Sequence, residues 1–339
     1  MIPAVSILLP CYNTATTLPE ALASLRVQTL ADFEVIAVDD GSTDTTGELL
    51  RETCEQDRRF TILSQPHAGI IPALNAGLAA CRAPYIARMD ADDRAHPARL
   101  ERQAAWLDQH PRVALVSCLV EAFPPDQVQQ GFRLYLDWLN ALVTHEDLCR
   151  EIFIESPFPH PSVMFRKEWV EQVGGYQDHG WPEDYDLWLR LYLAGAQFAK
   201  VPETLLAWRE RPDRLTRTDS RYSVENFLRA KAHYLMLGPL VGREAVILWG
   251  AGMIGRRLSK HLARAGAPLA AFVDIDPKKI GRVRRGCPVI PPEDLPAWWA
   301  RCQNPIILAA VAARGARQLI RERLTESGFV EGQDWLAVT

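Results

Sequence analysis

The sequence has no Cys-x-x-Cys pair, although it contains seven cysteines. An odd number of widely spaced cysteines fits neither a zinc site nor a disulfide framework, so we expect free thiols in a reducing compartment. No apolar run reaches the ~20 residues that cross a bilayer. The first residues lack the basic and apolar regions of a signal peptide. We therefore expect a cytoplasmic protein, and we leave peripheral contact with the inner face of the membrane open.

There is also no excess of basic charge. Lysine and arginine number 38 against 42 aspartates and glutamates, which gives a formal net charge of −4. Such a chain is a poor match for a phosphate backbone, so we expect no nucleic-acid partner. Hydrophobic residues make up 48% of the 339 positions and charged residues 24%, a globular composition. The length suggests roughly two domains.

The first part of the chain alternates apolar runs with amphipathic segments. We expect strands at 5–9, 34–38, 60–65, 85–89 and 113–118, separated by helices, with a capping box at Thr17–Glu20. This alternation predicts an α/β fold with an open parallel sheet and helices on both faces. Ligands of such sheets collect at the carboxyl ends of the strands.

The pattern loosens after residue 120, where we expect a strand at 162–166 and helices at 183–194 and 220–237. The glycine- and proline-containing stretch 238–242 is interpreted as a linker. A second, smaller α/β unit follows, with strands at 245–249, 269–273 and 306–311. We therefore predict domains at 1–238 and 243–339.

Two acidic clusters follow predicted strands. They are Asp39-Asp40 and Asp90-Ala91-Asp92-Asp93. Carboxylates gathered at one sheet edge suit Mg²⁺ or Mn²⁺, which also take phosphate oxygens and can neutralise a diphosphate leaving group. Asp40 could accept a ring N–H of a bound base. The plainer alternative is that these acids only cap helices and turns.

These residues carry a family resemblance. The stretches are VSILLPCYN (5–13), VDDGSTD (38–44), NAG (75–77), RMDADD (88–93), HPSVMFR (160–166) and EDYDLWLRL (183–191). In order and spacing, residues 1 to about 215 resemble a family 2 glycosyltransferase of the GT-A fold, with a DxD motif. The resemblance implies that one sugar moves from a nucleotide-diphosphate sugar, with inversion, to a hydroxyl of a glycan or lipid-linked acceptor in polysaccharide biosynthesis.

The resemblance also implies roles for individual residues. Asp92 would bind the metal, Asp184 would be the catalytic base, and Glu183 would orient the acceptor or the base. The nucleotide-sugar pocket would be formed by Pro10, Tyr12, Asn13, Asp40, Arg88, Asp90 and His160. His160 lies between prolines, and a structural role is an equal alternative.

The physical chemistry of Asp184 agrees with that role. An inverting transfer needs a base for the acceptor proton, and a carboxylate that begins a helix is kept ionised by the helix dipole. Trp181 precedes Glu183 and Asp184 and could stack on a sugar.

Two family features are missing. A histidine that helps to hold the metal in many relatives is absent from 208–212, so Arg209 or Arg211 could contact the diphosphate instead. The QxxRW signature of processive synthases is absent as well, which favours one sugar per encounter.

The second domain contains Gly250-Ala251-Gly252-Met253-Ile254-Gly255 between a predicted strand and helix, and Asp274 follows Gly255 by 19 positions. This spacing is typical of Rossmann-like domains, in which Gly250, Gly252, Gly255 and Asp274 would contact a nucleotide. A structural or assembly role, for example in a homodimer, and nucleotide sensing are alternatives. No Tyr-x-x-x-Lys pair is present, so we expect no hydride transfer and disfavour an NAD-dependent oxidoreductase.

Two further alternatives concern the whole chain. A nucleotidyltransferase would show a glycine-rich loop and a lysine after the first strand, where this chain has Pro10-Cys11-Tyr12-Asn13. A nucleotide-sensing regulatory protein would not need the intact DxD motif and the Glu183-Asp184 pair.

Overall fold

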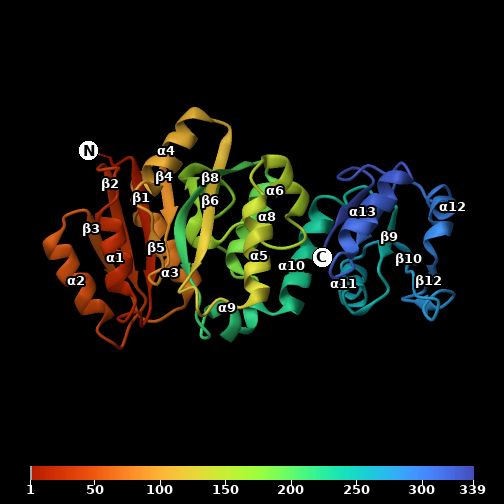
Figure 1. Cartoon of the computed structure of the whole chain (residues 1–339), viewed down its shortest axis with the longest axis horizontal. Helices are drawn as coiled ribbons and strands as arrows, with labels where there is room; N and C mark the ends of the chain where they lie inside the picture. Colours follow the sequence, from red (N-terminus) through yellow and green to blue (C-terminus); the bar gives the residue numbers. More distant parts are fainter. Residues whose placement is uncertain (1) are drawn as a thin grey trace. The chain divides into compact units, whose positions relative to one another are not determined.

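The computed structural model describes residues 2–339, which form two compact units (Figure 1). The first unit contains residues 2–148, Pro157–His179 and Glu183–Thr218, and the second contains Cys149–Ser156, Gly180–Pro182 and Asp219–Thr339. The domain boundary predicted from the sequence, at 238–243, instead assigns Asp219–Gly238, Cys149–Ser156 and Gly180–Pro182 to the first domain. The predicted domain boundary between 238 and 243 stays a prediction.

The first unit is built on an eight-stranded sheet with the order β3-β2-β1-β4-β7-β6-β8-β5. Its strands are β1 (Val5–Cys11), β2 (Phe33–Asp39), β3 (Phe60–Ser64), β4 (Tyr85–Arg88), β5 (Arg94–Ala95), β6 (Val113–Phe123), β7 (Met164–Arg166) and β8 (Gln197–Arg209). The strands β3, β2, β1 and β4 are parallel, as predicted. Cys11 lies opposite Asp39, so the segments after β1 and β2 leave the sheet at the same edge.

The other half of the sheet is mixed, and here the expected all-parallel sheet is wrong. Strand β7 lies between β4 and β6 and is antiparallel to both, and β6 is parallel to β8. An apolar run shows that a strand is buried, but it does not show the direction of the strand. Strand β8 was missed because Lys200 interrupts its apolar run. This lysine is fully buried and donates to Leu139 O at 2.6 Å.

Nine helices flank this sheet or connect its strands: α1 (Leu18–Arg26), α2 (Thr46–Gln56), α3 (Ile70–Ala80), α4 (Arg99–Gln109), α5 (Gln130–Ala141), α6 (His145–Glu151), α7 (Lys167–Gln172), α8 (Glu183–Leu193) and α9 (Leu215–Thr218). Helices α5 and α6 were not predicted. The capping box at Thr17 is also wrong, because the Thr17 side chain does not cap α1. Its hydroxyl donates to Ala91 O at 3.1 Å and so ties the start of α1 to the acidic loop.

The second unit contains a smaller sheet with the order β11-β12-β10-β9-β13-β14. Its elements are α10 (Val224–Leu237), β9 (Ala245–Trp249), α11 (Met253–Arg264), β10 (Leu269–Val273), β11 (Val283–Arg284), β12 (Cys287–Ile290), α12 (Leu295–Trp299), β13 (Pro305–Ala309), α13 (Ala316–Glu326) and β14 (Trp335–Ala337). All pairings except β11 with β12 are parallel. Within residues 2–339, no helix has the length and apolar character needed to cross a membrane.

Candidate functional site

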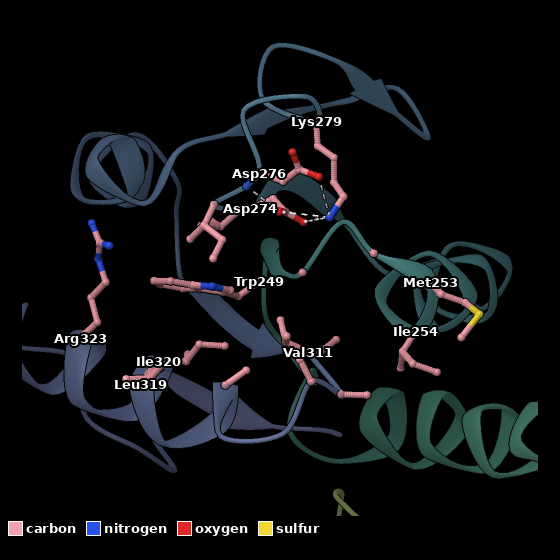
Figure 2. A pocket seen from close by; sticks show the side chains of 18 residues that line it. Trp249, Met253, Ile254, Asp274, Asp276, Lys279, Val311, Leu319, Ile320 and Arg323 are labelled. Atoms are coloured by element: carbon pink, nitrogen blue, oxygen red, sulfur yellow. Dashed lines mark hydrogen bonds and ion pairs between the residues drawn. The ribbon is translucent and has the colours of Figure 1, made fainter.

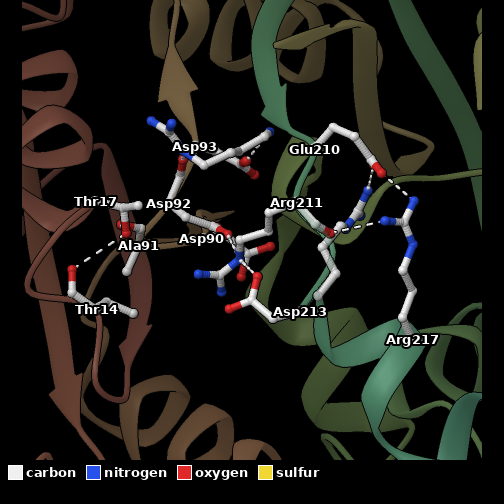
Figure 3. Close-up of polar contacts among 12 residues, drawn as sticks. Thr14, Thr17, Asp90, Ala91, Asp92, Asp93, Glu210, Arg211, Asp213 and Arg217 are labelled. Carbon is white, nitrogen blue, oxygen red and sulfur yellow. Dashed lines mark hydrogen bonds and ion pairs between the residues drawn. The ribbon is translucent and has the colours of Figure 1, made fainter. Parts of the chain in front are cut away.

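The acidic loop after β4 gathers three carboxylates. Asp90, Asp92 and Asp93 each offer an oxygen, and these oxygens lie within 4.8 Å of one another (Figure 3). Asp93 was not singled out as a metal ligand in the sequence, although it adjoins the DxD motif. Its side chain is buried, Oδ1 accepts from Arg209 N at 2.7 Å, and Oδ2 has no hydrogen-bond partner. A buried carboxylate oxygen without a partner, beside two further carboxylates, fits a divalent cation.

The charge balance of the loop supports the same conclusion. Burial raises the pKa of Asp92, and the neighbouring Asp90 raises it further. Burial raises the pKa of Asp93 well above its usual range, and Asp92 and Asp90 add to that effect. Neighbouring negative charges disfavour the ionised form of a carboxyl group. A cation between the carboxylates favours the ionised form instead.

Two arginines on one segment contact this loop in different ways. Arg209 is fully engaged, because its backbone N–H binds Asp93, Nε donates to Asp92 O at 2.6 Å, and the guanidinium pairs with Glu20. Arg211 instead directs Nε at Asp92 Oδ2, 3.1 Å away, and lies 3.5 Å from Asp213. Of the two arginines left open by the sequence, Arg211 therefore faces the acidic cluster with its side chain, and Arg209 braces the loop.

Arg88, the last residue of β4, is almost completely buried and pairs with Asp90. Its Nη1 atom is 2.5 Å from Asp90 Oδ1. Arg99 fixes the same strand end by donating from Nη2 to Arg88 O at 2.7 Å. Arg88 therefore orients Asp90, and this buried position leaves little of its surface for direct contact with a ligand.

The second acidic segment, after β2, organises a loop of the protein itself. Asp40 is buried, and its carboxylate accepts from Gln65 Nε2, Ala68 N and Gly69 N at 2.6–3.0 Å. His67 Nδ1 lies 2.8 Å from Asp40 Oδ2. Because these groups occupy both oxygens, the predicted contact of Asp40 with a base would require the loop at 65–69 to move.

Tyr12 and Asn13 border that loop. Tyr12 is partly exposed and stacks on His67, with ring centroids 4.0 Å apart and planes 16° from parallel. Asn13 has a positive φ of 50°, and its Oδ1 accepts from Thr43 N at 2.8 Å. Pro10 lies within the buried strand β1. No local pattern in the sequence marks His67, because its contacts depend on the chain returning to Asp40 after β3.

Glu183 and Asp184 begin helix α8, as predicted. Glu183 is buried and Asp184 half-buried, and Asp184 Oδ1 accepts from Tyr185 N at 2.7 Å. Burial raises the pKa of the Tyr176 phenol, and the charges of Glu183 and Asp184 contribute to the increase. The tyrosine therefore lies within electrostatic range of both carboxylates.

Tyr176 also connects this helix end to His160 and Asn75. The Tyr176 hydroxyl is 2.9 Å from His160 Nε2, and Asn75 exchanges two hydrogen bonds with the Tyr176 backbone. His160 is buried and packs edge-on against Trp188. Burial, and then the Arg88 charge, hold its pKa well below the usual range, so the ring is neutral at pH 7.

The remaining predicted residues lie in the second unit. Trp181 is buried there beside His233 and under the Arg229 guanidinium, 5.5 Å from the ring centroid. Its stacking on a sugar stays a prediction. Gly250 and Gly252 lie in the turn between β9 and α11, Gly255 lies in the first turn of α11, and Asp274 follows β10.

Comparison with known proteins fits this site. The sequence matches the family "Glycosyl transferase family 2" over residues 6–174. It is 33% identical over 211 residues to "Amylovoran biosynthesis glycosyltransferase AmsE" of Erwinia amylovora, covering 61% of this chain and 77% of that protein. It is 29% identical over 213 residues to "UDP-Gal:alpha-D-GlcNAc-diphosphoundecaprenol beta-1,3-galactosyltransferase" of Escherichia coli, covering 61% and 74%.

A solved structure shares the fold. The crystal structure of S. aureus TarS 1-349 in complex with UDP-GlcNAc superposes with a TM-score of 0.56 at 18% identity, over 77% of this chain and 70% of that one. The matched family and both relatives are glycosyltransferases. The chain is a glycosyltransferase enzyme with the GT-A fold, and it belongs to glycosyltransferase family 2.

Proposed function

We propose that this enzyme moves one sugar, with inversion at the anomeric carbon, from a nucleotide-diphosphate sugar to a hydroxyl of a glycan or lipid-linked acceptor, and that it requires Mn²⁺ or Mg²⁺. The observation that carries the proposal is the partnerless, buried Asp93 Oδ2 beside Asp92 and Asp90. Three carboxylates this close together repel one another, and a bound divalent cation neutralises that repulsion.

Asp92 and Asp93 would hold the metal, because Asp93 is buried with one oxygen unpartnered and Asp92 is half-buried beside it, whereas Asp90 is paired with Arg88. When bound, the ion supplies Lewis-acid stabilisation of the diphosphate leaving group. Asp90 is oriented by Arg88 and would contact the donor ribose, as the resemblance implies. Arg211 would turn from Asp92 toward the donor phosphates and add a second positive charge there.

Asp184 would take the proton of the acceptor hydroxyl as that oxygen attacks the anomeric carbon. The N-terminal end of α8 favours the ionised carboxylate, which is the form needed for proton transfer. Glu183 is buried behind it and would hold the acceptor or Asp184 in place. Tyr176, anchored by Asn75 and His160, would limit the movement of this part of the site.

The acceptor class is supported by the relatives. The printed name of the Escherichia coli relative describes transfer to a diphosphoundecaprenol-linked sugar, and the Erwinia relative acts in amylovoran biosynthesis. A lipid-linked acceptor would bring the enzyme to the cytoplasmic face of a membrane.

The test is release of nucleoside diphosphate from UDP-, GDP- and dTDP-sugars incubated with short glycans or with sugar-diphosphoundecaprenol. We expect one donor to be consumed in Mn²⁺ or Mg²⁺ and none in EDTA. Turnover in EDTA at the same rate would refute the metal requirement.

A further inference from the structure

The second unit contains a cavity of about 680 Å³ at the carboxyl ends of β9, β10 and β13 (Figure 2). We infer that this cavity is a metal-independent binding site for a nucleoside diphosphate, either free or as the nucleotide part of a nucleotide sugar. The inference rests on the second unit alone and does not depend on the proposed transferase chemistry.

The two glycines of the turn after β9 and the glycine in the first turn of α11 give the first indication. Gly250 has φ +121°, and a Cβ there would lie 2.6 Å from Ala310 O. A Cβ at Gly255 would lie 1.8 Å from Gly250 O. Both glycines are therefore required by the fold.

Gly252 is different. Its φ of −76° suits any residue, and an added Cβ would meet no atom within 4 Å. Gly252 borders the cavity. The fold does not require a glycine at this position, but a ligand that approaches the backbone closely would.

The positive groups around the cavity indicate the kind of ligand. Helix α11 begins at Met253, beside Gly252, and no side chain caps its first turn, so backbone N–H groups there suit an anion. Lys279 also lines the cavity. Its ammonium is 3.1 Å from Asp274 and 3.5 Å from Asp276, which holds it at the end of β10.

Asp274 does not have the free oxygens expected of a ribose ligand. Its carboxylate accepts from Ala251 N and Asp276 N, both at 2.9 Å, and from Lys279 Nζ. The predicted contact with ribose hydroxyls is therefore replaced by a structural role, in which Asp274 positions the glycine turn and Lys279. A phosphate group suits the resulting site better than the paired hydroxyls of a dinucleotide ribose.

The rest of the cavity is apolar and aromatic. The Trp249 ring crosses it between the Asp274 side and the residues Leu319 and Ile320 of α13 (Figure 2). Met253, Ile275 and Leu319 line the cavity, although all three are more than half exposed. An aromatic face with aliphatic neighbours suits a planar base.

The described residues that line the cavity include no serine, cysteine, histidine, tyrosine or glutamate. They therefore provide no usual nucleophile, and the only carboxylates are engaged with protein donors. The geometry supports binding and not catalysis. Among residues 2–339, the group of three acids that could hold a metal lies in the first unit, so binding in the second unit should need no metal.

The test is calorimetric titration of the full chain with UDP, GDP and ADP in EDTA. We expect at least one diphosphate to bind, and Gly252→Val to weaken that binding at least tenfold, because the added side chain fills ligand space while its Cβ meets no protein atom within 4 Å. Gly131→Val is the matched control, since Gly131 also has open space around it and lies in α5 of the first unit. Leu319→Glu should weaken binding too, by placing a negative charge at the cavity mouth, with Leu237→Glu, at a residue that is also more than half exposed, as control.

Three results would overturn the proposal: no diphosphate binds in EDTA, binding survives both Gly252→Val and Leu319→Glu, or NAD or NADP binds while diphosphates do not. Repeating the titration with UDP-, GDP- and ADP-sugars shows whether the ligand is a free nucleoside diphosphate or a nucleotide sugar. A nucleotide sugar that binds more tightly than its free diphosphate would be the ligand. Asp92→Asn should leave this binding unchanged, which separates it from the metal-dependent donor site.

Discussion

The Nε atom of Arg211 lies 3.1 Å from the Oδ2 atom of Asp92. The arginine thus places its positive charge against a carboxylate that we propose as a metal ligand. A cation entering the cluster would displace that contact, and the released guanidinium would then be available to the diphosphate. We therefore expect Arg211 to compete with the metal before donor binding and to assist donor binding afterwards.

The Arg211→Gln variant separates these two effects. Without nucleotide, we expect Mn²⁺ to bind severalfold more tightly, because the competing charge is gone. With Mn²⁺ present, we expect the nucleoside diphosphate to bind roughly ten- to hundredfold more weakly, since a charge-assisted hydrogen bond contributes roughly 1.5–3 kcal/mol. Calorimetry measures both affinities. If both weaken or neither changes, Arg211 does not have this dual role.

Asp92→Asn tests the metal site directly. Asparagine keeps the shape but removes the charge of one half-buried ligand. We expect the Mn²⁺-dependent increase in nucleotide affinity to disappear, as measured by titration with and without EDTA. The control is Asp213→Asn, which removes an exposed carboxylate on the other side of Arg211. A Mn²⁺ effect of normal size in Asp92→Asn would place the metal elsewhere.

The parts of the fold that could be predicted are the parts that a local sequence pattern determines. Strands β1, β2 and β4 are short apolar runs, and the loops after them could be placed at one sheet edge from alternation alone. The direction of β7 and the existence of β8 could not be predicted, because pairing between distant segments sets direction and because the buried Lys200 hides the apolar character of β8.

The site was predictable to the same extent. The DxD loop and the Glu183-Asp184 pair stand out as motifs, whereas Asp93 becomes notable only through its partnerless oxygen. The contacts of His67 with Asp40 and Tyr12 join segments 27 and 55 positions apart, and no local pattern marks such a contact. Asp274 shows the reverse case, since its spacing predicted a ligand contact, which stays a prediction, and the structure shows its carboxylate accepting from Lys279 and from two backbone N–H groups.

Asp184→Asn should abolish transfer while preserving donor binding. Asparagine cannot take the acceptor proton, and general-base catalysis is typically worth ~10²–10⁴-fold in rate. Steady-state kinetics and a donor titration check the two parts. The comparison is Asp186→Asn on the same helix, which breaks a buried pair with Arg190 at 2.7 Å and should lower the unfolding free energy by about 3–5 kcal/mol. The rates of the two variants are compared at equal concentrations of folded protein. If both variants lose the same fraction of the wild-type rate, the result argues against a specific role for Asp184.

His160 predicts a pH dependence of stability. Its pKa in the folded protein is well below the usual value, because burial and then the Arg88 charge disfavour the imidazolium. Below about pH 6.5 the unfolded chain gains a proton at this residue and the folded chain does not, so stability falls as the pH falls. The slope from this residue is at most about 1.4 kcal/mol per pH unit.

Urea unfolding of the wild type and His160→Gln between pH 5 and 8 measures this contribution. Glutamine can still hydrogen-bond the Tyr176 hydroxyl but does not titrate. We expect the stability of the variant to depend less steeply on pH below 6.5, with parallel curves above it. Parallel curves over the whole range would mean that His160 titrates normally in the folded protein.

The proposed chemistry is tested most directly by the anomeric configuration of the product. The donor that is consumed in Mn²⁺ would be incubated with its acceptor, and the new glycosidic linkage would be assigned by ¹H NMR. The account predicts an anomeric configuration opposite to that of the donor sugar, with no product in EDTA or from Asp184→Asn. A product that retains the donor configuration, or that forms at an unchanged rate in Asp184→Asn, would contradict single displacement with Asp184 as the base.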